Sequence, residues 1–131
     1  MMELVANLTH RYVMHGFMWY FHEDHHKKTE GFFEKNDIFF IIFAIPSMLL
    51  ISLGLFFQVY LSLSIGLGIL AYGIAYFLIH EVLIHRRFKF MDRFENKYFQ
   101  ALIKAHQEHH SKITQAGCSN FGMLWVSKEY F

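Results

Sequence analysis

The chain has 131 residues, of which 54% are hydrophobic and 19% aromatic, and its formal charge is +1. This length predicts a single domain over residues 1–131, and the apolar content excludes intrinsic disorder. The 12 Lys and Arg nearly balance the 11 Asp and Glu, so there is no basic footprint and we expect no nucleic-acid partner. A single cysteine, Cys118, excludes an intrachain disulfide framework and a cysteine-based zinc site.

The N-terminal segment from Leu4 to Phe21 is fairly apolar, but His10, Arg11 and His15 interrupt it. It is too short and too polar to span a bilayer alone. We interpret it as the cytoplasmic end of a helix whose membrane part is mostly absent, in an N-terminally shortened chain. It has neither a basic n-region nor a small-residue cleavage site, so it does not resemble a cleavable signal peptide.

The middle of the chain is strongly apolar, because residues 38–79 contain no Lys, Arg, Asp, Glu or His. One crossing of a bilayer core needs about 20 apolar helical residues, so this run is long enough for two crossings. We predict a helix over about residues 36–57, a tight turn near 58–63 and a second helix over about 64–87. The alternative is a buried hairpin in a soluble protein, but so small a domain could hardly cover this much apolar surface.

Small residues recur around the start of the second predicted helix, where Ser62, Ser64, Gly66 and Gly68 form two pairs spaced four residues apart. Such pairs allow helices to approach each other closely in lipid. Pro46 lies inside the first predicted helix, and we expect it to bend that helix because its ring removes a backbone hydrogen bond.

After the hairpin, apolar residues recur at helical spacing between charged ones, which predicts an amphipathic helix over about residues 93–112. This helix either lies at the membrane interface or packs as an ordinary cytoplasmic helix. Every Lys and Arg lies outside the apolar run, so the positive-inside rule places both flanks in the cytoplasm. We therefore predict an all-α integral inner-membrane protein, in which a transmembrane hairpin carries a cytoplasmic-side cap containing all the histidines.

All ten histidines fall into four clusters, and none is left over. The clusters are His10 and His15; His22, His25 and His26; His80 and His85; and His106, His109 and His110. The spacing of the first two clusters, Hx4H and then HxxHH, is repeated by the last two on the other side of the apolar run. A repeat of this kind does not arise by chance placement. The repeated spacing predicts a metal site.

The spacing also has a geometric meaning. An ideal helix turns about 100° per residue, so the three histidines of an HxxHH cluster lie close together around the helix axis. Their imidazoles therefore project from one face. Two such triads facing each other can enclose more than one metal ion. The Hx4H partners lie about 140° apart on an ideal helix, which fits either two different metal ions or a locally distorted turn.

Imidazole is a ligand that suits Fe, Zn, Cu and Ni. Ten ligands are more than one ion takes, so we expect two metals. Our interpretation is a dinuclear non-haem iron site that activates O2, with all ten histidines as ligands and no other catalytic residue. The carboxylates near the clusters either accept hydrogen bonds from the histidines or are solvated charges. They are Glu23, Asp24, Glu81 and Glu108.

Several other metal-binding classes fit less well. A His-rich tract that binds zinc or nickel adventitiously is contiguous rather than spaced along helix faces. A b-type haem needs only two axial histidines, and a transporter would place ligands inside its membrane spans. A di-iron carboxylate bundle needs Glu-x-x-His motifs, which these clusters do not form. A non-catalytic membrane protein that binds metal is the alternative outside the enzymes.

Four stretches of the sequence carry a resemblance to a known family: THRYVMH at 9–15, FEKND at 33–37, HEVLIHRR at 80–87 and GCSNFGML at 117–124. Together with the histidine clusters, they resemble the bacterial β-carotene 3-hydroxylases of the fatty acid hydroxylase superfamily. The resemblance implies hydroxylation of the β-ionone ring of β-carotene at C3 and C3′, through β-cryptoxanthin to zeaxanthin. It also implies two irons, O2 as co-substrate and a separate ferredoxin-type electron donor with its reductase. Another lipid or sterol hydroxylase, or a desaturase of the same superfamily, is the alternative.

Two further sets of residues could serve this reaction. Several aromatic side chains either line a substrate channel or face lipid and other helices. They are Phe17, Trp19, Tyr20, Phe39, Tyr72, Tyr76 and Phe77. A basic set either docks an acidic electron donor or anchors the chain at the membrane surface. It consists of Arg86, Arg87, Lys89 and Arg93.

Overall fold

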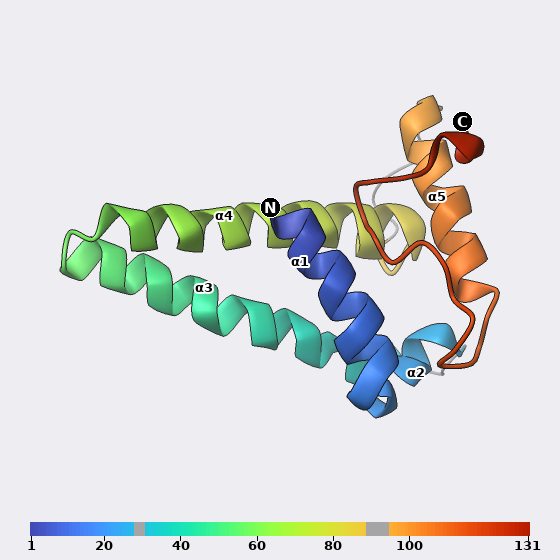
Figure 1. The fold of residues 1–131 in the computed structure, drawn as a ribbon, viewed down its shortest axis with the longest axis horizontal. Coiled ribbons are helices and arrows are strands. Elements are labelled where there is room, and N and C mark those ends of the chain that lie inside the picture. Colours follow the sequence, from blue (N-terminus) through green and yellow to red (C-terminus); the bar gives the residue numbers. More distant parts are fainter. Residues whose placement is uncertain (28–30, 89–94) are drawn as a thin grey trace.

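The computed structural model describes residues 1–27, 31–88 and 95–131, and all regular secondary structure within them is helical. Figure 1 shows a long helical hairpin that carries a cap of shorter helices at the end remote from its turn. The prediction of an all-α fold is therefore confirmed.

The hairpin consists of α3 (Ile38–Phe56) and α4 (Tyr60–Tyr76), and α4 continues as a π-helix, η3 (Phe77–Ile84). The short 3-10 helix η2 (Lys35–Asp37) leads into α3. The two helices were predicted correctly, but the bounds of the second were wrong at both ends. It begins at residue 60 rather than 64, and it ends at 84 rather than 87.

The turn of the hairpin is shorter than predicted because Gln58 adopts a left-handed backbone conformation, with φ of 56°. This single residue reverses the chain between Phe57 and Val59, where residues 58–63 had been expected to form the turn. No glycine or proline marks the position, so the sequence carries no signal for it.

The two hairpin helices touch at small residues, as predicted, but only one of the two pairs takes part. A Cβ on Gly66 would lie 2.8 Å from the backbone nitrogen of Ile51, whereas a Cβ on Gly68 would meet nothing within 4 Å. The Ser62 hydroxyl donates to the Leu50 carbonyl across the interface at 2.8 Å, while that of Ser64 bonds within its own helix. The Ser62 and Gly66 face is therefore the packing face.

The remaining hairpin surface is exposed and apolar. Two stretches, Lys35–Phe56 and Tyr60–Ile84, are 22 and 25 residues long and apolar enough to cross a membrane. At about 1.5 Å per residue, each is longer than the roughly 30 Å of a bilayer core. Only 17% and 6% of their most apolar windows are buried, whereas the core helix of a soluble protein is mostly buried.

The N-terminal part of the chain forms α1 (Met2–Leu8), a second π-helix η1 (Thr9–Phe17) and α2 (Trp19–His26). The φ and ψ of Gly16, −106° and −125°, interrupt the helix and redirect the chain into α2. Figure 1 shows α1 lying beside the hairpin and α2 near the end of α3. Glu3 of α1 joins three elements, because it accepts hydrogen bonds from the Tyr72 hydroxyl and from backbone N–H groups of residues 123–125.

Helix α5 (Lys97–His110) lies across the end of the hairpin, as Figure 1 shows. Its amphipathic character is confirmed, since one face is buried and the opposite face is exposed. The predicted start at residue 93 was too early, because residues 95 and 96 are not helical and the Asn96 side chain caps the first turn. Residues 93 and 94 lie outside the described part of the chain. The C-terminal segment then runs back along α5 to a final 3-10 turn, η4 (Lys128–Tyr130).

Arg87 fastens the cap to the hairpin. Its guanidinium donates to both carboxylate oxygens of Asp37, at 2.7 and 2.9 Å, and to Glu81 at 2.7 Å. This engagement within the chain disfavours Arg87 as part of a docking surface for an electron donor. In the same basic set, Arg86 is exposed, whereas Lys89 and Arg93 lie outside the described residues.

Candidate metal centre

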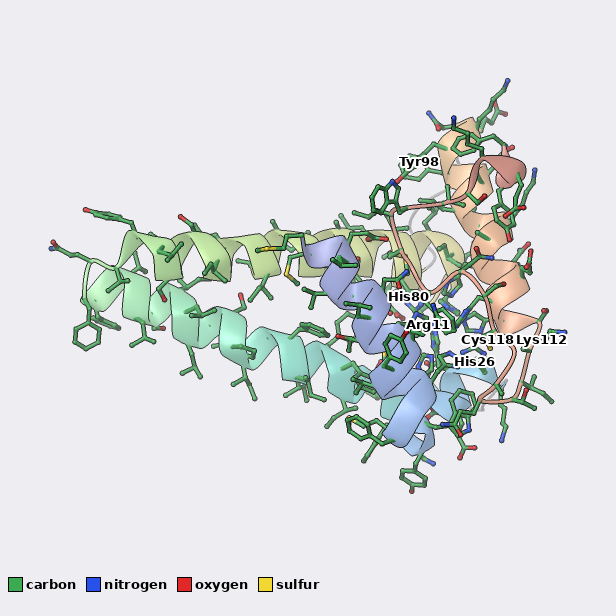
Figure 2. The ribbon with its side chains drawn as sticks, in the orientation of Figure 1. Arg11, His26, His80, Tyr98, Lys112 and Cys118 are labelled. Carbon is green, nitrogen blue, oxygen red and sulfur yellow. The ribbon has the colours of Figure 1, made fainter. Side chains whose placement is uncertain are left out.

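All ten histidine side chains meet in the cap, next to the end of the hairpin. They form two groups of five, and within each group one ring nitrogen of every histidine lies within 4.8 Å of those of the others. Group A contains His10, His15, His22, His26 and His109; group B contains His25, His80, His85, His106 and His110. Figure 2 shows His26 and His80 in this concentration of ring nitrogens at the end of the hairpin.

The two halves of the chain exchange one histidine each. Group A takes four of the five histidines of the N-terminal half and adds His109 from α5. Group B takes four of the C-terminal half and adds His25 from α2. In each HxxHH cluster, the first and last histidines thus belong to one group and the middle one to the other. The two triads do face each other, and each contributes to both groups.

The two π-helices explain how the Hx4H pairs reach a single group. In a π-helix the backbone bonds join residues five apart, so residues i and i+5 lie on the same side of the helix. His10 and His15 lie in η1, and His80 lies in η3, where the His85 backbone N–H donates to the His80 carbonyl at 2.9 Å. Of the two alternatives for the Hx4H spacing, the locally distorted turn is correct.

In group A, a neutral oxygen accepts a hydrogen bond from Nδ1–H of every histidine. Four acceptors are backbone carbonyls and the fifth is an amide oxygen: those of Phe121 for His10, Gln115 for His15, Asn36 for His22, Lys112 for His26 and Ser119 for His109. Because an oxygen of this kind has no proton to give, Nδ1 must carry it and Nε2 keeps its lone pair. All five Nε2 atoms of group A are therefore acceptors that point at one another.

The separations of these nitrogens fit a shared cation. The Nε2 atom of His22 lies 3.0 Å from that of His10 and 3.2 Å from that of His26, and the His15 and His109 pair is 3.2 Å apart. Two lone pairs at this distance repel each other unless a positive charge lies between them. Two imidazole nitrogens bound at about 2.1 Å to one ion, at right angles, would be about 3.0 Å apart.

Group B has the same arrangement of nitrogens but a different support. The Nε2 atoms of His25 and His80 are 3.1 Å apart, and those of His85 and His106 are 3.0 Å apart. The buried Nε2 of His110 has no hydrogen-bond partner among the described residues. A metal ion would satisfy this atom and the two facing pairs together, so the residues of group B also fit a metal.

Carboxylates stand behind two of the group B histidines. His25 Nδ1–H donates to Glu34 at 2.8 Å, and His80 Nδ1–H donates to Glu81 at 2.6 Å. Burial raises the pKa of Glu34 to about 7, although the nearby Arg87 charge acts in the opposite direction. Carboxylate partners of this kind fix the orientation of a metal-binding imidazole and make it more basic.

Burial also sets the protonation state of the histidines. It lowers the pKa of His26 to about 4 and the pKa values of His85 and His109 to about 3, because charged imidazolium is poorly solvated there. The same cause holds the pKa values of His10, His25 and His106 well below the usual 6.5. These six histidines are therefore neutral at pH 7, which is the form that binds a metal.

Of the four carboxylates near the clusters in the sequence, Glu81 alone bonds to a histidine within the described residues. Glu23 pairs with Lys27, Asp24 accepts from the Lys35 backbone, and Glu108 accepts from Ser119 and Tyr130. The histidine pattern did not single out Glu34 or Asn36, although both lie in the FEKND stretch that carries the family resemblance. The four carbonyls were also missed, because any residue supplies a carbonyl and composition gives no signal for one.

An apolar cavity of about 470 Å³ lies between α1, η1 and the hairpin and reaches group A. His10 and Asn36 form part of its wall, together with aliphatic and aromatic side chains of α3 and α4. Four of the seven aromatic candidates line it, namely Phe39, Tyr72, Tyr76 and Phe77. The other three do not: Phe17 and Tyr20 are exposed, and Trp19 packs on the rings of His15, His22 and His26.

Comparison with known proteins identifies the family. Residues 1–129 match the Fatty acid hydroxylase family. The chain is 41% identical over 125 residues to a β-carotene hydroxylase of Pantoea ananas, an alignment that covers 95% of this chain and 71% of the relative. It is 40% identical over 127 residues to one from Pseudescherichia vulneris, covering 97% and 72%.

Two further relatives carry similar names. A β-carotene hydroxylase of Paracoccus sp. (strain PC1) is 35% identical over 126 residues, covering 95% of this chain and 77% of the relative. The chloroplastic β-carotene 3-hydroxylase of an Oncidium hybrid cultivar is 41% identical over 113 residues, covering 84% and 37%. No solved structure matches the chain significantly. With two helices long enough to span a membrane and a family match over nearly its whole length, the chain belongs to the fatty acid hydroxylase family of membrane enzymes.

Proposed function

We propose that this chain hydroxylates the β-ionone ring of β-carotene at C3 and C3′, giving β-cryptoxanthin and then zeaxanthin. The observation that carries the proposal is the convergence of two groups of five histidines next to an apolar cavity. The names of the relatives support the choice of substrate.

We propose that groups A and B each hold one iron ion through Nε2 atoms, with all ten histidines as ligands. Imidazole donors suit iron, and five donors per ion leave a six-coordinate metal one further position. The two irons would supply the activation of O2 and the removal of hydrogen from a ring carbon that has no acidity, which acid and base side chains cannot perform.

The chain's own residues bind and orient the substrate. A volume of 470 Å³ lies within the usual range of ligand pockets, and the hydrocarbon walls match a ring that has no polar group. Because His10 lies in the cavity wall, a ring bound there lies against group A. The Nδ1 hydrogen bonds hold the imidazoles in place before the substrate arrives, and the apolar walls exclude water from the reacting carbon.

The membrane arrangement suits a substrate as apolar as lipid. Most of the cavity wall comes from α1, α3 and α4, so the ring can enter from the bilayer side while electrons arrive from the aqueous side. We infer that the hairpin spans the inner membrane, that the cap faces the cytoplasm and that a separate ferredoxin-type protein with its reductase supplies the electrons. The position of every Lys and Arg outside the apolar run supports this orientation.

The test is to produce the chain in bacterial cells that accumulate β-carotene, and to measure both pigments and metal content in one membrane preparation. The expected result is β-cryptoxanthin and zeaxanthin, with about two irons per purified chain, and no hydroxylated pigment when O2 is withheld. Iron-loaded protein that leaves β-carotene unchanged in the presence of O2 and a working electron donor would overturn the choice of substrate. Zinc or copper in place of iron would favour a non-catalytic metal-binding protein.

A further inference from the structure

We propose that the two metal positions are unequal: group B is the anchoring position, which retains its metal more tightly, and group A is the labile position beside the substrate cavity. This inference rests on the proposed metal centre and adds a difference in metal retention between its two positions. Two independent features carry it: the chemical nature of the hydrogen-bond acceptors and the elements from which those acceptors come.

The acceptors differ in charge. Each of the five histidines of group A donates to a neutral oxygen, whereas His25 and His80 of group B donate to the carboxylates of Glu34 and Glu81. An anion behind an imidazole draws on its Nδ1 proton and increases the electron density at Nε2. Nε2 then binds a metal cation more strongly, and loss of such a partner typically costs about 10- to 100-fold in metal affinity.

The carboxylates of group B are themselves held in place. Glu81 is buried, and Arg87 donates a hydrogen bond to it at 2.7 Å. Arg87 also donates two hydrogen bonds to Asp37. The backbone N–H of Glu34 donates to Asp37 in a capping box at the start of η2. Hydrogen bonds among Arg87, Glu81 and Asp37 therefore tie the Glu81 carboxylate and the Glu34 backbone to the ends of the hairpin helices.

The acceptors of group A come mostly from a segment without regular structure. The carbonyls of Lys112, Gln115, Ser119 and Phe121 all lie between α5 and η4. This segment, residues 112–121, is tied to η1 through the Gln115 side chain, which donates to the carbonyls of His15 and Gly16, and through the Phe121 ring, which packs on His10 and His15. Displacing it removes four of the five acceptors at once, so the metal in group A depends on a loop and that in group B depends on helices.

The cavity lies on the labile side. His10 of group A and Asn36, which supports His22, both line it, and no histidine of group B does. Tyr76 separates group B from the cavity by stacking on the His80 ring, with ring centroids 4.6 Å apart. A substrate ring in the cavity therefore lies against group A, and group B holds the second metal behind it.

The test is the release of iron from the purified, iron-loaded protein into excess chelator at pH 8, above the pKa of about 7 that burial gives Glu34, so that Glu34 is a carboxylate. We expect two phases of equal amplitude, a fast phase from group A and a slow phase from group B. Glu34→Gln keeps an acceptor but removes its charge, and should accelerate the slow phase about 10- to 100-fold while leaving the fast phase unchanged. The reciprocal change, Asn36→Asp, places a carboxylate behind His22 and should slow the fast phase.

A matched control and a second readout make the result decisive. Glu23→Gln removes a carboxylate of α2 that pairs with Lys27 on the protein surface, and should alter neither phase. With ⁵⁷Fe, the wild-type protein should give two Mössbauer doublets of equal area, of which E34Q shifts only the slowly released one. Two irons that leave in a single phase, or E34Q that accelerates the fast phase, would overturn the inequality while leaving the metal centre intact. A preparation that binds no iron would instead remove the proposed function.

Discussion

The hairpin and the histidine cap are stabilised in opposite ways. In the hairpin, α3 and α4 meet through glycine and serine, and more than half of their large apolar side chains are exposed. In the cap, the buried side chains of the described residues include seven histidines, Glu81 and Asn36. One region thus exposes apolar groups and the other buries polar ones.

This difference indicates what each region needs in order to fold. The outward apolar surface of the hairpin is satisfied by lipid, and its backbone hydrogen bonds are made within each helix. The cap buries nitrogen lone pairs that face one another at 3.0 to 3.2 Å, an arrangement that is unfavourable without a cation between them. The hairpin should therefore be stable in a membrane by itself, whereas the cap should depend on its metals.

The largest expected effect follows from removing the metals. Complete chelation should unfold much of the cap, including α2 and α5, and should leave α3 and α4 intact. Hydrogen exchange read by mass spectrometry in detergent would compare the amides of both regions before and after chelation. Protection of α5 should fall to nearly none, and that of α3 should stay unchanged. If α5 kept its full protection without metal, the cap would be stabilised by packing alone.

Removal of one histidine tests the same dependence at a single position. His25→Ala takes away the only histidine that α2 contributes to group B, and should reduce hydroxylation at least about 100-fold while leaving membrane insertion unchanged. Pigment analysis and membrane fractionation measure the two properties separately. Glu23→Ala, at a position of α2 whose side chain pairs with Lys27, is the matched control and should retain activity. Normal turnover by the His25 variant would exclude this residue from the ligand set.

Acid should act on the cap before it acts on the hairpin. In the unfolded chain histidine takes a proton near pH 6.5, whereas in the folded protein burial lowers the pKa of His26 to about 4 and that of His109 to about 3. Between these values the unfolded state binds more protons, so the stability of the cap is full above about pH 6.5 and falls as the pH drops toward 4. Metal release should follow the same direction. The amides of α3 should keep their protection over this range.

The sequence predicted the hairpin well because hydropathy alone defines it. It also predicted which residue type converges in the candidate site, because ten histidines in a repeated spacing are typical of a metal centre. It did not predict the distribution between the two groups. That distribution depends on the π-helical turns at His10 and His80 and on the crossing of α2 and α5, which are tertiary features. The acceptors behind group A escaped prediction for a similar reason, since a loop carbonyl becomes an acceptor only through its position.

The smallest effect tests the close approach of the hairpin helices, using two glycines of one helix. Gly66→Ala places a Cβ 2.8 Å from the Ile51 backbone nitrogen and 2.9 Å from the Ser47 carbonyl oxygen, so the helices must separate, at a cost of about 1–3 kcal/mol in the free energy of unfolding. Gly68→Ala meets nothing within 4 Å and should be neutral or stabilising by up to about 1 kcal/mol, because alanine favours the helix. Equilibrium unfolding in mixed detergent micelles, followed by circular dichroism, would compare them. Since the hairpin does not depend on the metals, the difference between the two variants should persist after chelation, and its disappearance would mean that the cap holds α3 against α4.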